Sequence, residues 1–186
     1  MREAQPARAQ RDFDDAVQLL ELPAKDPSEE RARRQALGAA LVERASHRAT
    51  VGKPVPSRGE GPSEAQQVVE RLAALRERAP DDVELQLAAG RAAVLWALAL
   101  ESSDVAAARA QASAAAVLAR EVVSRRPDRP AAAVLVVRAT LLAGRAQEAL
   151  VAARGFESRG VLEVSPLVAE AALFAGDFEL ARTQAV

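Results

Sequence analysis

A short sequence pattern recurs near the C-terminus, and it constrains the fold more than any other feature of the chain. Residues 144–150 read GRAQEAL and residues 176–182 read GDFELAR, 32 residues further on, while RDFDDAV at 11–17 is similar to both. Recurrence at a spacing of this size indicates successive copies of one supersecondary unit. Since such a unit has an apolar face that it cannot bury alone, neighbouring copies are expected to stack and share a continuous core.

The segments around these copies show the periodicity of α-helices. Between Ser63 and Ala79, for example, apolar residues follow a spacing of 3.6: Ala65, Val68, Val69, Leu72, Leu75 and Ala79. No segment alternates as a strand does, and Pro and Gly separate the periodic segments. The sequence therefore predicts an all-α fold of about nine helices, over residues 12–22, 28–47, 63–79, 83–100, 105–126, 131–143, 146–158, 162–175 and 177–186.

Residue types that begin and end helices support these boundaries. Ser28 follows Pro27 and is a suitable cap for the second helix, and Ser103 or Asp104 is suitable for the fifth. Gly144 and Gly176 each follow a helical segment, where a left-handed residue commonly ends a helix. We therefore predict a positive φ at both glycines.

The repeated turn resembles that of the tetratricopeptide (TPR) repeats. In that family the segment contains the tight turn and the start of the second helix of a hairpin, with a small residue allowing close approach to the first helix. Two further features are similar to the family: the large-small pairs Leu37-Gly38 and Ala89-Gly90, and the prolines Pro27, Pro80 and Pro127. The resemblance covers about Asp12 to Val186 and implies a right-handed α-α superhelix, a TPR-like solenoid.

The same pattern divides the chain into two parts. Residues 1–11 form a polar N-terminal segment, and residues 12–186 form the helical repeat domain, with a flexible Gly- and Pro-rich loop over 50–62. Complete hairpins are expected at about 28–80, 82–127 and 130–161. Because neither end supplies a polar capping helix, we expect either a fragment of a longer array or ends that pack on another subunit, as a homo- or hetero-oligomer.

Composition argues against several functional classes. The net charge of -1 gives no basic field for nucleic acid, and the absence of Cys excludes disulfides and Cys-ligated zinc. The N-terminus has no apolar signal region, and the apolar stretch 85–100 is short for a bilayer span of about 20 residues. These features predict a cytoplasmic protein without membrane insertion.

The residues needed for enzymatic chemistry are also missing. His47 is the only histidine, and it is expected as an exposed residue at a helix end. The sequence has neither a Gly-x-Ser-x-Gly nucleophile turn nor a Gly-rich phosphate loop following a strand. We therefore predict that the protein is not an enzyme and has no metal or other cofactor.

The TPR resemblance implies a concave groove lined by the first helix of each hairpin. The candidate groove residues are Glu84, Leu87, Arg91 and Val94 in one hairpin, Arg138, Leu141 and Leu142 in the next, and Glu163, Glu170 and Leu173 in the last. Arg91 and Arg138 occupy equivalent positions, and two guanidinium groups can pair with a carboxylate. The expected function is that of an interaction scaffold or adaptor, and the expected ligand is another protein's acidic segment or C-terminus.

Other interpretations remain open at this point. Arg138 is as well explained by an intramolecular salt bridge to Glu170. The chain is alternatively a structural assembly subunit of a larger complex, held through its ends and convex faces and without a peptide ligand. The family's carboxylate clamp needs Asn, and this chain has none. The aromatic residues are expected in the core: Phe13, Trp96, Phe156, Phe174 and Phe178.

Overall fold

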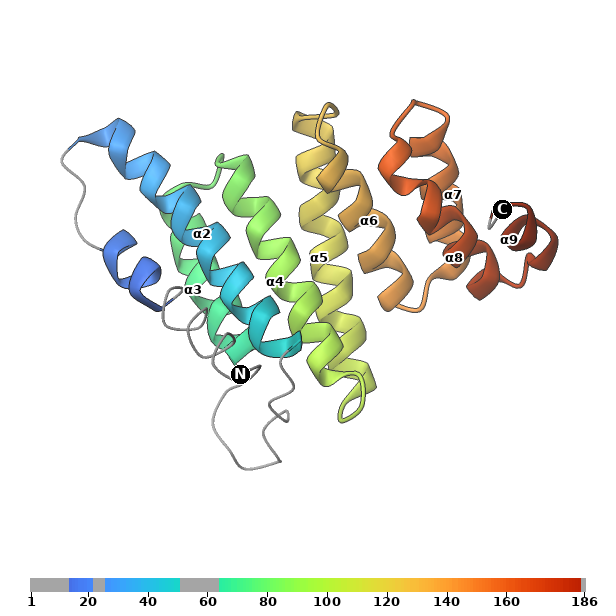
Figure 1. The fold of residues 1–186 in the computed structure, drawn as a ribbon, viewed down its shortest axis with the longest axis horizontal. Coiled ribbons are helices and arrows are strands. Elements are labelled where there is room, and N and C mark those ends of the chain that lie inside the picture. The colour runs from blue at the N-terminus through green and yellow to red at the C-terminus, as the bar shows by residue number, and fades with distance from the viewer. Residues whose placement is uncertain (1–13, 22–25, 51–63, 185–186) are drawn as a thin grey trace, which may run out of the picture. The chain divides into compact units, whose positions relative to one another are not determined.

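The structure, a computed structural model, describes residues 14–21, 26–50 and 64–184. Throughout these ranges the chain forms helices joined by turns and contains no strand, which confirms the prediction of an all-α fold (Figure 1). The helices group into two compact units, residues 1–99 and 100–186.

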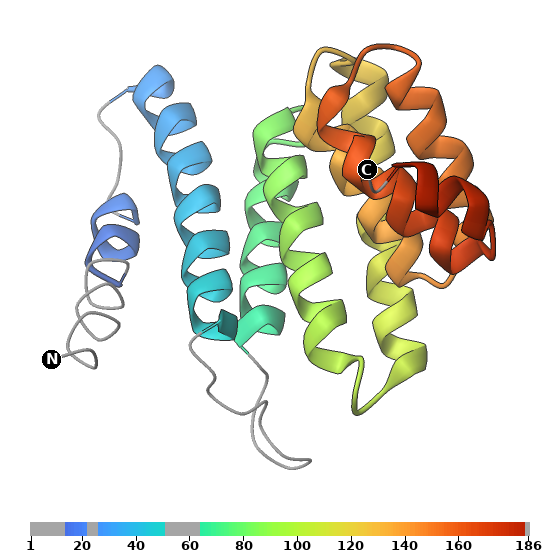
Figure 2. The same ribbon diagram turned by 45° about the vertical axis from the view of Figure 1, so that its right-hand side comes forward.

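Unit 1 contains a short helix over residues 14–20 and three longer helices. These are α2 (Pro27–Thr50), α3 (Glu64–Arg78) and α4 (Val83–Leu100). The three long helices run alongside one another (Figures 1 and 2). The largest fully buried side chains of this unit are Leu41, Val68, Leu72 and Leu85. The predicted loop covered residues 50–62, but Thr50 is the last residue of α2. Residues 51–62 lie outside the described residues.

Gly38 lies at the point where α2 approaches both other long helices. A Cβ atom at this position would lie 3.1 Å from Leu85 Cδ2, 3.4 Å from Ala88 Cβ and 3.4 Å from Leu72 Cδ2. The first of these contacts is tighter than an ordinary van der Waals separation, so the missing side chain is what allows the helices to approach. The prediction that Leu37-Gly38 is a large-small pair at a helix crossing is confirmed.

Helix α4 is the most apolar of the long helices. Among the described helices it alone is long and apolar enough to cross a membrane by length and composition. Half of it is buried within the fold, and the core helix of a globular domain passes the same test. This agrees with the interpretation of the 85–100 stretch as a buried helix.

Unit 2 contains α5 (Val105–Arg125), α6 (Pro130–Leu142), α7 (Ala146–Glu157), the 3-10 turn η1 (Leu162–Val164), α8 (Ser165–Ala175) and α9 (Phe178–Gln184). Consecutive helices pack against each other, and α6 also contacts α8 (Figure 2). The buried face of α5 consists mostly of methyl groups: Ala108, Ala112, Ala115, Ala116 and Ala119. Side chains this small permit close approach between helix axes.

The start of α2 differs from the prediction. Asp26 rather than Ser28 is the capping residue, because its Oδ1 accepts a hydrogen bond from the Glu29 N–H at 2.8 Å. The Ser28 hydroxyl donates to the same oxygen at 2.7 Å. Pro27 then occupies the first helical position, where its fixed φ and missing N–H are favourable. These hydrogen bonds hold the pKa of the Asp26 carboxyl below its usual value, and the one from the Glu29 N–H has the largest effect.

The C-terminal hairpin also departs from the predicted continuous helix over 162–175. Residues 162–164 form the 3-10 turn η1, and α8 begins at Ser165 with Pro166 in its first turn. A proline at this position has no N–H with which to continue a helix from Leu162, so the helix restarts. Gly144 and Gly176 have φ of 77° and 81°, which confirms the left-handed geometry predicted for both.

The aromatic residues divide into buried and exposed groups. Phe156 is buried, at 7% exposed, and Trp96 is half-buried. Phe174 and Phe178 are 67% and 68% exposed, so their predicted core position is wrong. The reason is that no described element covers the faces of α8 and α9 on which they lie. Phe13 lies outside the described residues.

Candidate functional site

Helix α6 presents one narrow stripe to solvent. Arg138 is its only exposed residue, and the half-exposed residues around it are apolar: Ala131, Val134, Leu141 and Leu142. Their spacing of seven and four residues before Arg138, and three and four after it, places all five on one face of the helix. Arg138 has no hydrogen bond or ion pair through its side chain to any described residue. The stripe is therefore an apolar surface that contains one guanidinium without a side-chain partner among the described residues.

Helix α8, which contacts α6, has an exposed stripe of similar character. It contains Pro166, Glu170, Leu173 and Phe174, at positions i, i+4, i+7 and i+8. Glu170 and Arg138 form no ion pair in the described part of the chain, so the intramolecular salt bridge considered from the sequence is absent there. Glu163 lies before α8, in η1, and is also exposed.

The remaining predicted groove residues belong to α4, in unit 1. Arg91 is exposed and has no side-chain partner among the described residues, while Glu84 and Val94 are half-buried. Leu87 is only 6% exposed, so it offers little surface to a partner. Sequence spacing placed Leu87 on the Arg91 face, but the burial of α4 extends around much of its circumference, which spacing alone does not reveal.

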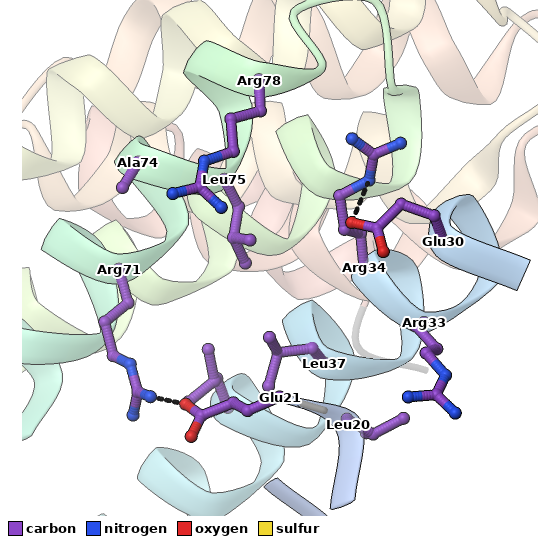
Figure 3. Close-up of a pocket in the computed structure, with 11 residues that line it drawn as sticks. Leu20, Glu21, Glu30, Arg33, Arg34, Leu37, Arg71, Ala74, Leu75 and Arg78 are labelled. Atoms are coloured by element: carbon purple, nitrogen blue, oxygen red, sulfur yellow. Dashed lines mark ion pairs between the residues drawn. The ribbon is translucent and has the colours of Figure 1, made fainter. Parts of the chain in front are cut away.

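A pocket in unit 1 was not predicted from the sequence. It has a volume of about 510 Å³ and is formed by α2, α3 and the end of the 14–20 helix (Figure 3). Its apolar lining residues are Leu20, Leu37, Leu41, Ala74 and Leu75. Its charged lining residues are Glu21, Glu30, Arg33, Arg34, Arg71 and Arg78. The pocket thus combines an aliphatic floor with a rim rich in arginine.

Two of the rim arginines are held by carboxylates of the chain itself. Arg71 forms an ion pair with Glu21, and Arg33 forms one with Glu29 at 2.8 Å (Figure 3 shows the first pair). Such pairs fix the arginine side chains without adding much stability at an exposed site.

The other two rim arginines are less engaged. Arg34 Nε lies 3.9 Å from Glu30 Oε1, at the limit for an ion pair, and has no hydrogen-bond partner among the described residues. Arg78 has no side-chain partner in the described part of the chain. The pocket therefore has guanidinium groups with unused hydrogen-bonding capacity.

The pocket does have a weak signature in the sequence. On α3, Arg71, Ala74, Leu75 and Arg78 lie at i, i+3, i+4 and i+7. On α2, Glu30, Arg34, Leu37 and Leu41 follow the same face. Each stripe taken alone is typical of the border between a buried and a solvated helix face. Only the tertiary arrangement, with the 14–20 helix beside both, makes them one site.

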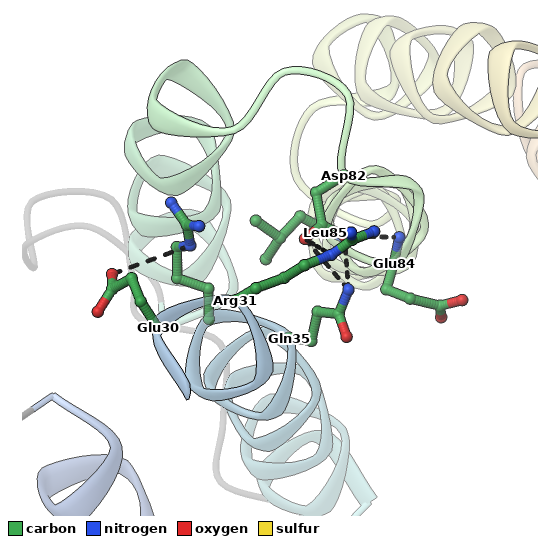
Figure 4. Close-up of polar contacts among 7 residues, drawn as sticks. Glu30, Arg31, Gln35, Asp82, Glu84 and Leu85 are labelled. Atoms are coloured by element: carbon green, nitrogen blue, oxygen red, sulfur yellow. Dashed lines mark hydrogen bonds and ion pairs between the residues drawn. The ribbon is translucent and has the colours of Figure 1, made fainter. Parts of the chain in front are cut away.

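A polar cluster around Asp82 lies elsewhere in unit 1 (Figure 4). Asp82 is 5% exposed, and its carboxylate accepts hydrogen bonds from Gln35 Nε2 at 3.1 and 3.2 Å. It also accepts from the backbone N–H groups of Glu84 and Leu85, and Arg31 Nε lies 3.8 Å away. Because the carboxylate is so fully engaged, we assign this cluster to structure rather than to ligand binding.

A second cavity, of about 350 Å³, lies in unit 2. The Arg159 guanidinium carbon lies 4.7 Å from the centre of the Phe156 ring that lines this cavity, and Arg159 Nε donates to the Gly155 carbonyl at 2.9 Å. Asp128 at its edge is paired with Arg126 at 2.9 Å, and that hydrogen bond lowers the pKa of the Asp128 carboxyl. The polar groups here have partners from the chain itself.

No group of three or more His, Asp or Glu side chains among the described residues is arranged to hold a metal ion. His47, expected at an exposed helix end, is half-buried within the last turns of α2.

Comparison with known proteins gives no further guide to the site. No family model, curated protein or solved structure matches this chain. The function is therefore inferred from the surfaces described above.

Proposed function

We propose that this chain is a protein-interaction scaffold, a TPR-like array of stacked helical hairpins that binds an acidic segment of a partner protein. The exposed faces of α6 and α8 form the binding surface of this proposal. One observation carries it: on the solvent-facing stripe of α6, the exposed guanidinium of Arg138, which has no side-chain partner among the described residues, lies beside apolar residues that the described part of the chain covers only partly.

The order of contacts in unit 2 supports the stacked arrangement. Helices α6 and α7 form one hairpin and α8 and α9 the next, and the first helices of the two hairpins contact each other. In a right-handed array of hairpins, the first helices line the concave side. The proposed groove residues of this unit are Arg138, Leu141, Leu142, Glu163, Glu170 and Leu173.

The chemistry of the stripe favours a carboxylate next to aliphatic side chains. A guanidinium binds a carboxylate through two parallel hydrogen bonds, and these are stronger where neighbouring groups exclude water. Val134 and Leu141 flank Arg138 and supply such an environment. Glu170 on α8 would orient the ligand, because it repels a second acidic group and attracts a basic one.

The proposal is tested by measuring the binding of labelled peptides. A peptide of about 12 residues with a central Glu between leucines, long enough to follow a helix face, is titrated against the chain by fluorescence anisotropy, next to a peptide with Gln in place of Glu. We expect the Glu peptide to bind, and Arg138→Ala to weaken its binding about tenfold or more, since a hydrogen-bonded charge pair is lost.

Arg154→Ala is the matched control. Arg154 is an exposed arginine of α7 that likewise has no side-chain partner among the described residues. Equal effects of the two substitutions, or equal binding of the Glu and Gln peptides, would show that α6 is not a carboxylate site. Arg91→Ala tests the equivalent position of unit 1 separately.

A second function, that of an assembly subunit, is favoured by the apolar residues at the end of unit 2. Leu173, Phe174 and Phe178 are 53%, 67% and 68% exposed, and exposed apolar patches mark protein interfaces. This alternative predicts a concentration-dependent dimer or larger species in sedimentation velocity, which Phe174→Ser with Phe178→Ser abolishes. A chain that stays monomeric at high concentration would contradict self-assembly.

A further inference from the structure

We infer that the arginine-rimmed pocket of unit 1 is a separate binding site for an acidic peptide segment that inserts one aliphatic side chain. The segment's carboxylate would bind Arg78 and Arg34, and its aliphatic side chain would lie against Leu20 and Leu75. The residues are distinct from those of the α6 stripe, so the inference does not depend on the proposed function.

The two less engaged arginines supply the charge for this site. Arg78 has no side-chain partner among the described residues, and the approach of Glu30 to Arg34 Nε is no closer than 3.9 Å. The five donors of a guanidinium gain most from a planar, bidentate acceptor such as a carboxylate. Both arginines line the same pocket and have N–H donors that a carboxylate of a ligand could use.

The pocket already contains an example of the interaction. Glu21, from the segment that ends the 14–20 helix, is paired with Arg71 on α3 (Figure 3). Arg78 lies seven residues further along α3 and on the same face, which corresponds to about 10 Å of helix rise. A partner carboxylate on Arg78 would repeat the Glu21–Arg71 pair two turns along the same helix.

The floor explains why the ligand must have an aliphatic group. Leu37 and Leu75 point into the space between α2 and α3 (Figure 3), and Leu75 and Leu20 are only partly buried by the chain itself. Covering this surface would remove apolar area from water. The volume of about 510 Å³ is within the range of sites that bury a small ligand, which suits a few peptide residues.

Other ligand classes fit less well. A lipid chain prefers a continuous apolar lining, but six of the eleven lining residues are charged. A phosphate backbone requires a broad excess of positive charge, whereas the four rim arginines face Glu21, Glu29 and Glu30. A single carboxylate matches this small excess of one positive charge.

The test uses the full chain, an acetylated hexapeptide containing Glu-Leu, and amide NMR shifts. We expect shifts to cluster at residues of α2 and α3 that line the pocket, Leu37, Leu75 and Arg78 among them. Replacing Glu by Gln in the peptide, or Arg78 by Gln in the chain, is expected to weaken binding about tenfold. Replacing the peptide's Leu by Ala is expected to weaken it severalfold.

Two controls separate this site from the α6 stripe and from a change in folding. Arg138→Ala should leave the pocket shifts unchanged, and Glu77→Gln, an exposed substitution on α3, should do the same. Arg78→Lys, which keeps the charge but loses the planar fork, should bind with intermediate affinity. An unchanged spectrum elsewhere in Arg78→Gln shows that the variant is folded, and Leu75→Ala gives an independent variant.

Three results would overturn the inference. One is an absence of pocket shifts at millimolar peptide, and another is equal binding of the Glu and Gln peptides. The third is tighter binding of decanoate than of the peptide at the same residues, which would assign the pocket to fatty acids.

Discussion

The side-chain amide of Gln35, on α2, donates to both carboxylate oxygens of Asp82, the residue just before α4, at 3.1 and 3.2 Å (Figure 4). The two residues are 47 positions apart in the chain. The same carboxylate accepts from the N–H groups of Glu84 and Leu85. A single buried side chain therefore caps one helix and joins it to another.

Replacing Asp82 by Ala is expected to reduce the free energy of unfolding by about 2 kcal/mol, because a helix cap and a buried side-chain acceptor are lost together. Asp104→Ala is the matched control. Asp104 caps α5 by accepting from the Ala107 N–H at 3.0 Å but is exposed, so a loss of about 1 kcal/mol is expected. Urea denaturation followed by circular dichroism measures both, and equal losses would contradict a role for Gln35.

Two glycines within helices should respond in opposite directions to alanine. A Cβ atom added at Gly155, in α7, would meet no atom within 4 Å apart from its chain neighbours and the nearby backbone of its own helix, so Gly155→Ala should raise the free energy of unfolding by about 1 kcal/mol through helix propensity. At Gly38 the new methyl would crowd Leu85 at 3.1 Å. We expect Gly38→Ala to lower stability by about 1 kcal/mol, since overpacking exceeds the gain in propensity. Thermal and urea unfolding distinguish the signs.

The cap of α2 gives a pH dependence. The pKa of Asp26 is lowered in the folded chain, from a usual value of 3.8, mainly by the Glu29 N–H. The ionised carboxylate therefore favours folding at pH values above 3.8, and this contribution is lost as the pH falls through the lowered pKa. The Glu29 amide resonance should follow that titration. In Asp26→Asn, which keeps an acceptor oxygen without the charge, it should not; an unaltered titration would assign the effect to another group.

The division among the aromatic residues predicts unequal costs of truncation. Phe156→Ala should destabilise the chain by about 3 kcal/mol, because a buried ring leaves a cavity. Phe174→Ala, at a ring that is 67% exposed, should change stability by no more than about 0.5 kcal/mol. Chemical denaturation of both variants checks this, and a large loss for Phe174→Ala would mean that another surface covers the ring in solution.

Local chemistry determined which parts of the fold could be predicted. The left-handed ends at Gly144 and Gly176 were predictable because few other residues adopt that geometry without strain. The choice between Asp26 and Ser28 could not be made from residue type, because both side chains are good caps and only the position of Pro27 distinguishes them. The break before Ser165 was not predicted, because the apolar residues keep a helical spacing across Pro166.

The candidate sites could also be predicted only in part from the sequence. Helical spacing placed Arg91 and Arg138 on helix faces that are indeed exposed, but it did not show that Leu87 is buried. Whether a face is covered depends on helices that are distant in sequence. The pocket of unit 1 was missed for this reason, since Glu21, Leu37 and Arg78 come from three separate segments.

The alanine face of α5 leaves the register between α5 and α6 weakly specified when unit 2 folds. Sliding α5 by four residues along α6 would replace Ala108 by Ala112 and Ala112 by Ala116, so the methyl face barely distinguishes one register from the next. The correct register between α5 and α6 must therefore be selected by side chains that, unlike the alanines, do not recur every four residues along the helix. Arg120 is such a group, since it contacts both Thr140 on α6 and Glu148 on α7. A shift of α5 by one turn would break both contacts and leave the Arg120 guanidinium without these partners.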